Sequence, residues 1–219
     1  MTEFDRIYLV WRQGPGTRRH AVGILDRDVA GSHTFKYLPE AKSLMSSEGF
    51  TPYTEFQELD KIYNGNVADI FGQRLVRVER SDSGSFFRFW EADQDKVTDK
   101  FYLLGKTQGL VATDNFEFLA DYHLCPETHF VTEVAGLSHD KLDRDEISIG
   151  DRLTFKPEPD NIIDPEAVIV LKDDRKIGYI KKYHNHIFNK PGAEHLTLTV
   201  KALDQNGTIK RIFVLVKYP

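Results

Sequence analysis

Three polar side chains in one loop have the types and spacing to bind a ligand hydroxyl. Asp160, Asn161 and Asp164 lie in residues 157–165, a stretch with three prolines that is longer than ordinary hairpin connections of about two to five residues. A carboxylate in such a loop accepts hydrogen bonds, but Asx side chains also bond their own backbone in turns. For Asp160 and Asn161 we favour turn chemistry. For Asp164, which precedes Pro165 and an apolar strand, both interpretations stay open.

A basic pair follows the same region and has the chemistry to hold a phosphate. Lys181 and Lys182 end a predicted strand and lead into a predicted short helix over residues 182–189. Lysine side chains and free N–H groups at a helix start can both point at a phosphate. A solvated charged face explains the pair equally well. Charged residues in the preceding turn are better explained as solvated: Lys172, Arg175 and Lys176.

Neither a metal site nor a cofactor site is expected. His123, Cys125 and His129 lie close together in the sequence. A tetrahedral zinc site needs four ligands, usually with a second spaced pair, and the sequence has no CxxC or HxxxH motif.

Catalysis is also not expected. The sequence has no P-loop, no GxSxG or HExxH motif, and no HRD or DFG kinase element. Pro159-Asp160 has a faint similarity to metal-dependent nucleases. The strand that should carry their second carboxylate reads Val170-Leu171-Lys172 instead. We therefore predict a protein that is not an enzyme.

Apolar periodicity divides the chain into a mixed N-terminal part and a β-rich C-terminal part. Strand-like runs cover residues 7–11, 20–25 and 32–37; Pro39 then opens a helical stretch, and helical spacing continues from residue 50 to about 119. Beyond Pro126 the predicted strands cover residues 130–137, 152–156, 167–171, 176–180, 195–203 and 208–217. The prediction is an α+β fold with two domains, residues 1–126 and 127–219.

The composition limits the classes of partner. The chain is 40% hydrophobic and has a single cysteine, Cys125, with neither a membrane-length apolar run nor a signal-peptide layout. We expect a cytoplasmic protein that has no membrane partner. The net charge of −5 argues against a general electrostatic grip on nucleic acid. Residues 1–127 carry 15 basic and 20 acidic side chains and residues 128–219 carry 14 of each, so a local basic face is compatible with the C-terminal part.

Several motifs of the C-terminal part occur in the order found in one known family. They are Val134-Ala135-Gly136-Leu137, Gly150-Asp151-Arg152-Leu153, Glu158-Pro159-Asp160-Asn161 with Asp164 and Ala167, and Ile177-Gly178-Tyr179-Ile180 leading into Lys181. Residues from about 130 to 217 therefore resemble the HIRAN domain. The resemblance implies a small β-barrel related to OB-folds.

The resemblance also implies a ligand, because a eukaryotic member of the family captures the 3′ end of single-stranded DNA. There, an aspartate in the loop before the second strand contacts the terminal 3′-hydroxyl, and Asp164 matches its position. A basic residue after the glycine-containing strand contacts the DNA backbone, and Lys181 and Lys182 match it. Tyr179 and His139 would supply ring surface for the bases.

The sequence departs from the family pattern after Gly136-Leu137. The DNA-binding relative has an arginine and aromatic residues there, whereas this chain has Ser138, His139 and Asp140. Loss of the arginine and gain of Asp140 weaken the expected phosphate contact. The ring of His139 keeps the capacity to stack on a base.

The first 120 residues resemble, more loosely, the N-terminal part of HipA-type kinase toxins. The matching segments are Val22-Gly23-Ile24-Leu25, Phe35-Lys36-Tyr37-Leu38, Phe101-Tyr102-Leu103-Leu104-Gly105 and Thr113-Asp114. The sequence lacks the kinase catalytic core of that family, so no kinase activity carries over.

The leading hypothesis is a non-catalytic protein whose barrel binds single-stranded DNA, preferably at a 3′ end. The rival is a protein-interaction module of the toxin–antitoxin or DNA-repair accessory kind. In the rival, the acidic N-terminal domain binds a protein partner and the barrel is a scaffold. A metal-dependent nuclease is a weaker third hypothesis.

Overall fold

The chain divides into two compact units. The computed structural model describes residues 2–77, 79–137, 146–206 and 208–219. One unit is Phe4–Asp121, and the other is Tyr122–Pro219 together with Met1–Glu3. The division falls a few residues before Pro126, where we predict the domain boundary.

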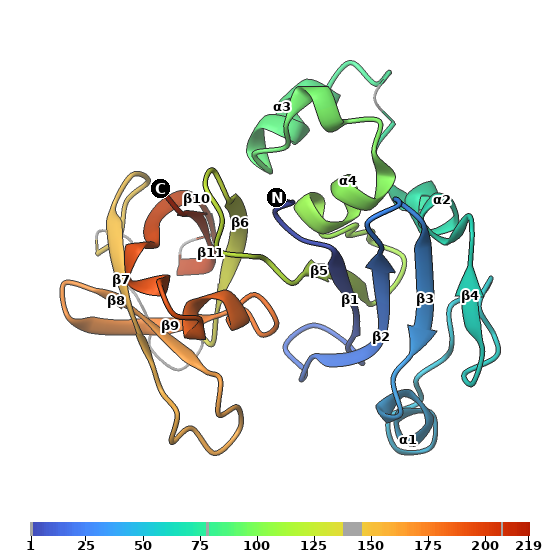
Figure 1. Cartoon of the computed structure of the whole chain (residues 1–219). Helices are drawn as coiled ribbons and strands as arrows, with labels where there is room; N and C mark the ends of the chain where they lie inside the picture. The colour runs from blue at the N-terminus through green and yellow to red at the C-terminus, as the bar shows by residue number, and fades with distance from the viewer. Residues whose placement is uncertain (1, 78, 138–145, 207) are drawn as a thin grey trace. The chain divides into compact units, whose positions relative to one another are not determined.

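The unit Phe4–Asp121 is an antiparallel sheet with short helices (Figure 1). Its sheet has the strand order β4-β3-β2-β1-β5. The strands are β1 (Arg6–Trp11), β2 (His20–Arg27), β3 (His33–Tyr37), β4 (Ile62–Asn64) and β5 (Phe116–Ala120). The helices are α1 (Glu40–Ser47), α2 (Val67–Phe71), α3 (Ser83–Phe89) and α4 (Lys100–Thr107), with 3-10 turns η1 (Gly72–Arg74) and η2 (Gln94–Lys96).

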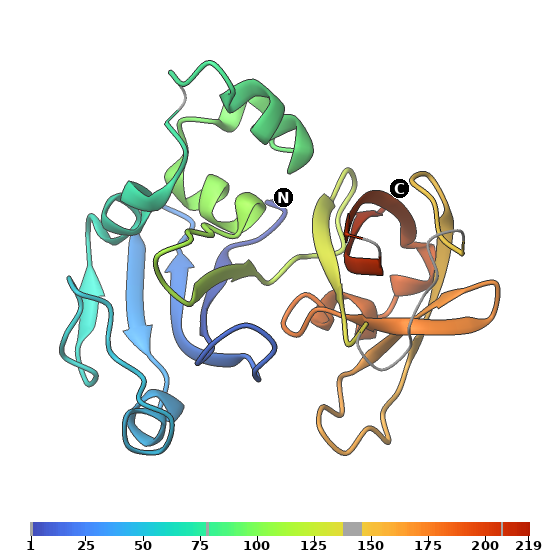
Figure 2. The same ribbon diagram turned by 180° about the vertical axis from the view of Figure 1, so that it is seen from behind.

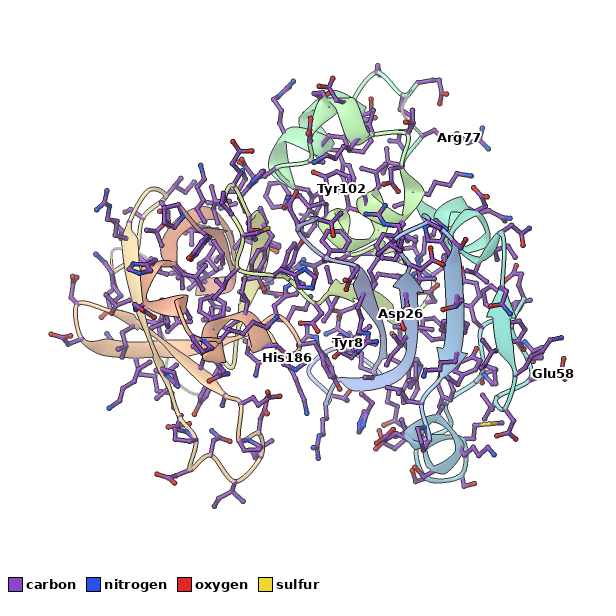
Figure 3. The ribbon with its side chains drawn as sticks, viewed as in Figure 1. Tyr8, Asp26, Glu58, Arg77, Tyr102 and His186 are labelled. Atoms are coloured by element: carbon purple, nitrogen blue, oxygen red, sulfur yellow. The ribbon has the colours of Figure 1, made fainter. Side chains whose placement is uncertain are left out.

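Aromatic side chains fill the core of this unit. Phe35 on β3 is fully buried, and its ring centroid lies 5.2 Å from that of Phe56 and 5.0 Å from that of Phe71. Such ring pairs add about 0.5–1.5 kcal/mol each beyond the area that they bury. At the sheet surface, Asp26 of β2 (labelled in Figure 3) accepts a hydrogen bond from Arg6 of β1 at 2.7 Å.

Two strands, β4 and β5, lie where we expected helical structure. In β5, Phe118 is buried with its ring 5.0 Å from Phe71. The neighbouring Glu117 is also buried, and its carboxylate lies 3.2 Å from Arg19 and 3.4 Å from Arg12. On one side β5 pairs with β1, and on the other the N–H of Phe118 donates to the carbonyl of Gln108 at 2.9 Å. The prediction was wrong here because β5 is buried on both faces, so that Phe118, Leu119 and Ala120 form a continuous apolar run, and because β4 has only three residues, too few to show a two-residue alternation.

The second unit is a closed antiparallel barrel (Figure 2). Its strands follow the order β10-β11-β6-β9-β8-β7 around the barrel. They are β6 (His129–Ala135), β7 (Arg152–Pro157), β8 (Val168–Lys172), β9 (Arg175–Ile180), β10 (Thr197–Asn206) and β11 (Thr208–Lys217). The prediction of an α+β fold with a β-barrel in the C-terminal part is confirmed.

Alternating apolar residues build the barrel interior. Ile212, Val214 and Val216 on β11 are fully buried, because alternate side chains of a strand share one face. On β9, Gly178 lets the backbone of β6 approach closely: a Cβ there would lie 2.5 Å from the carbonyl oxygen of Ala135.

The connection from β9 to β10 contains less helix than predicted. The helix expected over residues 182–189 is reduced to a 3-10 turn, η3 (His186–Asn189), and a second turn, η4 (Ala193–His195), follows. Tyr183 adopts a left-handed backbone with φ of +73°, which an α-helix does not accommodate.

Among the described residues, the structure has no helix that is long and apolar enough to cross a membrane.

Candidate nucleic-acid interface

The loop between β7 and β8 is closed by its own backbone. The N–H of Glu158 donates to the carbonyl of Ala167 at 2.8 Å, and the N–H of Ala167 donates to Asp164 at 2.9 Å. A third bond joins the N–H of Asn161 to the carbonyl of Glu158 at 3.0 Å. The loop is therefore held in one conformation even though its tip is exposed.

Asn161 is the organising residue of this loop. Its Oδ1 accepts hydrogen bonds from the N–H groups of Ile163 (3.0 Å) and Asp164 (3.1 Å). This is the turn chemistry that we favoured for Asn161. Its Nδ2 also donates to the carboxylate of Glu158 and, at 3.3 Å, to the hydroxyl of Tyr179 on β9. Asp160 is exposed beside it.

Asp164 makes one local turn bond and one bond to a distant segment, and its contact with a ligand hydroxyl stays a prediction. Its Oδ1 accepts from the N–H of Glu166 at 3.1 Å, which is a local turn bond. Its Oδ2 accepts from Nδ2 of Asn185 at 3.1 Å. An ionised carboxylate has about four lone-pair positions, so the half-buried Asp164 keeps acceptor capacity for a ligand hydroxyl while its orientation is fixed on both sides.

Asn185 is a residue that sequence reasoning missed. It is buried in the connection after β9, and its Nδ2 also donates to the carbonyl of Glu166 at 2.7 Å. Its Oδ1 is buried and has no hydrogen-bond partner among the described residues. The sequence carries no signal for this role, because the contact joins positions 21 residues apart through the tertiary fold.

Tyr179 lies on β9 with its hydroxyl in a polar cluster. The hydroxyl donates to the carboxylate of Glu158 at 2.9 Å, and Nζ of Lys176 lies 2.6 Å from it. Two hydrogen bonds hold the pKa of the Glu158 carboxyl below its ordinary value of 4.5. The bond from Asn161 has the larger effect and the bond from Tyr179 the smaller one. Lys176, which we assigned to a solvated turn, therefore belongs to this cluster.

The two lysines of the predicted phosphate-binding pair have different environments. Lys181 is only 1% exposed, and its Nζ lies 4.0 Å from the carboxylate of Glu133, which Arg211 also approaches at 2.9 Å. Lys182 is half-buried, with its Nζ 5.5 Å from the ring centroid of Tyr183. Both lysines follow the end of β9 at Ile180, and of the two only Lys182 has part of its side chain at the surface. The structure thus buries Lys181, and its assignment to a phosphate stays a prediction.

The short turn that follows does not supply the helix start that we expected for a phosphate. His186 (labelled in Figure 3) opens η3, and its Nε2 lies 3.3 Å from the carboxylate of Glu166. A turn of four residues has too few aligned peptide groups for a substantial dipole. The side chains of this region are therefore the groups that we expect to contact a phosphate.

The predicted site also has an opposite wall, at residues 138–140. His139, with Ser138 and Asp140, lies outside the described residues. The structure therefore brings Asp164 and Tyr179 together through Asn161, places Lys182 at the end of β9, and leaves the role of His139 a prediction.

The cluster His123, Cys125 and His129 makes local contacts. The Sγ of Cys125 lies 2.9 Å from Oγ1 of Thr128, and Nδ1 of His129 lies 2.6 Å from the carbonyl oxygen of Glu127. In the part of the chain that the structure describes, no group of three His, Cys, Asp or Glu side chains is arranged to hold a metal ion.

A closed antiparallel barrel with a rigid acidic loop after its second strand defines the structural class of this unit. The family model of the HIRAN domain matches residues 128–197. This match confirms the HIRAN resemblance for the C-terminal part. It leaves the resemblance of the first 120 residues to HipA-type toxins a prediction.

Two solved structures are similar to part of the chain. The crystal structure of the HIRAN domain of human HLTF is 14% identical, with a TM-score of 0.32, and the match covers 41% of this chain and 75% of that one. A crystal structure of a protein from Lactobacillus plantarum is 22% identical, with a TM-score of 0.28, and the match covers 40% of this chain and 92% of that one. No curated protein matches the chain.

Proposed function

We propose that this protein binds single-stranded nucleic acid through its barrel and prefers a strand that ends in a free 3′-hydroxyl. The observation that carries the proposal is the fixed carboxylate of Asp164, held between its own turn and Asn185. It occupies the loop position where the HIRAN resemblance expects a hydroxyl acceptor. The match of residues 128–197 to the HIRAN family supports the same ligand class.

The charge around Asp164 favours a hydroxyl over a phosphate at the strand end. Glu158, Asp160 and Glu166 lie in the same loop as Asp164, and the loop from 158 to 166 has no basic residue. A terminal phosphate would place further negative charge against these carboxylates, whereas a hydroxyl donates a hydrogen bond to one of them. The loop thus selects by repulsion as well as by attraction.

Few cations are available to hold the rest of the strand. Lys182 is the member of the basic pair that reaches the surface, and Lys176 lies over the ring of Tyr179 at 4.2 Å. Stacking on rings such as Tyr179 and His139 contributes about 1–3 kcal/mol per base. We therefore propose modest affinity, and a role that consists of binding alone.

A pair of isosteric substitutions in one loop tests the assignment. Asp164→Asn should reduce the preference for a 3′-hydroxyl over a 3′-phosphate oligonucleotide by about tenfold, because it removes a charge-assisted hydrogen bond. Asp160→Asn removes the same charge from an exposed position of the same loop and should reduce that preference only slightly, through the lost repulsion of the phosphate. Fluorescence anisotropy measures both, and thermal melting checks that both variants are folded. If the two variants behave alike, Asp164 is not the hydroxyl acceptor.

The surplus of acidic side chains in the N-terminal part of the chain favours a second candidate function. Residues 1–127 carry five more acidic than basic side chains, and Asp60 and Asp69 are among those that are largely exposed. Such a surface fits a basic protein partner. A pull-down from the native host that recovers one protein and no nucleic acid would favour this function over the first.

A further inference from the structure

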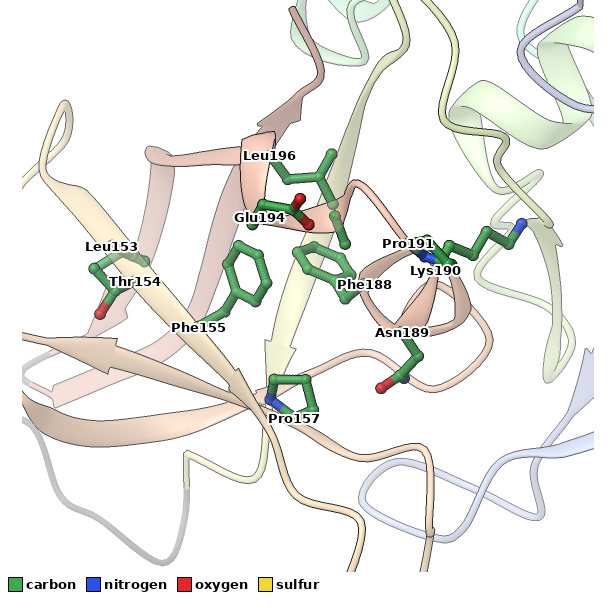
Figure 4. Close-up of a pocket in the computed structure, with 11 residues that line it drawn as sticks. Leu153, Thr154, Phe155, Pro157, Phe188, Asn189, Lys190, Pro191, Glu194 and Leu196 are labelled. Atoms are coloured by element: carbon green, nitrogen blue, oxygen red, sulfur yellow. The ribbon is translucent and has the colours of Figure 1, made fainter.

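A groove on the barrel unit lies between β7 and the connection that leads to β10. Its volume is about 720 Å³. Most of its lining is apolar: Leu153, Phe155, Pro157, Phe188, Pro191 and Leu196. Figure 4 shows the rings of Phe155 and Phe188 side by side at its centre, and their centroids lie 4.9 Å apart at an angle of 79°. The edge-to-face ring pair gives the groove a preformed floor.

The groove exists because one seam of the barrel is only partly closed. Strand β7 pairs with β10 at two positions, Leu153 with Leu198 and Arg152 with Thr199. Further along, the chain before β10 coils into η4 instead of continuing beside β7. From Thr154 to Pro157, β7 is paired with β8 alone among the described strands.

The backbone of β7 directs hydrogen-bonding groups into this open seam. The N–H of Glu158 donates to Ala167 on the β8 side. In an antiparallel ladder alternate residues face the same neighbour, so Lys156 and Thr154 also turn toward β8. Phe155 then directs its N–H and C=O to the opposite side, into the groove. Pro157 directs only a carbonyl there, in keeping with the confinement of proline to strand edges.

The charges of the groove do not suit a phosphate-bearing ligand. Lys190 is the one cation in the lining, and its Nζ donates to the carbonyl of Tyr122 at 2.8 Å. In Figure 4 its side chain extends away from the groove. The remaining ionic side chain in the lining is Glu194, which is 71% exposed. The rim thus offers a negative charge above an apolar floor.

We propose that this groove binds an extended peptide segment of a partner protein as an added strand beside β7. The free edge at Phe155 would supply main-chain hydrogen bonds, as in other cases of strand addition. The apolar floor takes side chains at alternate positions of the peptide. The carboxylate of Glu194 favours a peptide that places a lysine or arginine beside it.

A random dodecapeptide phage library selected against the full chain tests this proposal. We expect enriched peptides in which apolar residues alternate and a basic residue lies near one end. Synthetic copies should bind about tenfold or more weakly when an amide that faces β7 is N-methylated, because the lost main-chain hydrogen bond removes affinity. N-methylation of the alternate amides, which face away from β7, should have less effect. Amide NMR shifts on binding should fall in residues 153–157 and 188–196.

Two variants of the groove and one control complete the test. Ala193→Trp places an indole in the groove and should abolish binding, with thermal melting to confirm that the variant is folded. Glu194→Lys changes only an exposed side chain and should weaken the peptides that carry a basic residue. Asp160→Asn lies outside the groove and should change the affinity of neither class of peptide, those with a basic residue and those without one. The proposal is overturned if no enriched peptide loses affinity in Ala193→Trp or Glu194→Lys, or if the NMR shifts lie elsewhere.

Discussion

Neighbouring residues of the same type have different roles in this barrel because burial separates them. Lys181 lies inside the barrel unit near Glu133, and Lys182 reaches the surface. The sequence alone treats the two as equivalent. Their environments predict that one lysine stabilises the fold and the other binds a ligand.

Substitution of each lysine should therefore change a different property. Lys181→Ala should lower the free energy of unfolding by about 2–4 kcal/mol, because it leaves the carboxylate of Glu133 with one cation fewer in a mostly buried site. Lys182→Ala should leave stability within about 0.5 kcal/mol and weaken oligonucleotide binding. Urea unfolding and fluorescence anisotropy measure the two properties. Equal losses of stability in both variants would contradict this division of roles.

Glu158 gives the acidic loop a pH dependence. Its pKa is lowered by the hydrogen bonds from Asn161 and Tyr179, so the folded loop favours the ionised carboxylate. The stabilisation is present above the pKa of the unfolded chain and is lost as the pH falls through the lower pKa of the folded state. In an NMR titration, Glu158 and the side-chain amide of Asn161 should share a midpoint below 4.5, the ordinary value. A midpoint at or above it would show that these bonds do not form.

At the scale of elements, β9 depends on one glycine. Gly178 has a φ of +155°, and an added Cβ would lie 2.5 Å from the carbonyl oxygen of Ala135 and 2.6 Å from Cγ1 of Val134. Either β6 or β9 must move to accept a side chain, and Tyr179 and Lys182 would move with β9.

Gly178→Ala should therefore destabilise the protein by about 2–3 kcal/mol and weaken oligonucleotide binding. Gly14→Ala is the control, because a Cβ at Gly14 meets nothing within 4 Å, and its effect should stay within about 0.5 kcal/mol. Chemical denaturation compares the two. A loss in Gly178→Ala no larger than in Gly14→Ala would show that the β6–β9 seam tolerates a side chain.

Some elements could be predicted from the sequence because their pattern is local. The alternation of Leu153 with Phe155 and of Ile177 with Tyr179 predicted β7 and β9, and the turn chemistry of Asn161 was favoured from its residue type. The burial of Lys181 and the contact between Asn185 and Asp164 could not be predicted. Lysine is seldom buried, and a contact between distant segments exists only once the barrel closes.

At the scale of the whole molecule, charge makes any binding to nucleic acid selective rather than general. The net charge is −5 and residues 128–219 have no basic excess, so an unspecific attraction to a polyanion is weak. We propose that discrimination comes from the end of the nucleic-acid strand, through contacts with Asp164, Tyr179 and Lys182. We therefore expect the affinity to depend on whether the 3′ end of the nucleic acid carries a hydroxyl or a phosphate.

The most direct test of this account compares two oligonucleotides with the full chain. Single strands of the same sequence, one with a 3′-hydroxyl and one with a 3′-phosphate, are titrated by fluorescence anisotropy at fixed salt. The account predicts that the 3′-hydroxyl strand binds about tenfold more tightly, through one charge-assisted hydrogen bond at Asp164. Equal affinity for the two strands, or tighter binding of the phosphorylated end, would contradict it.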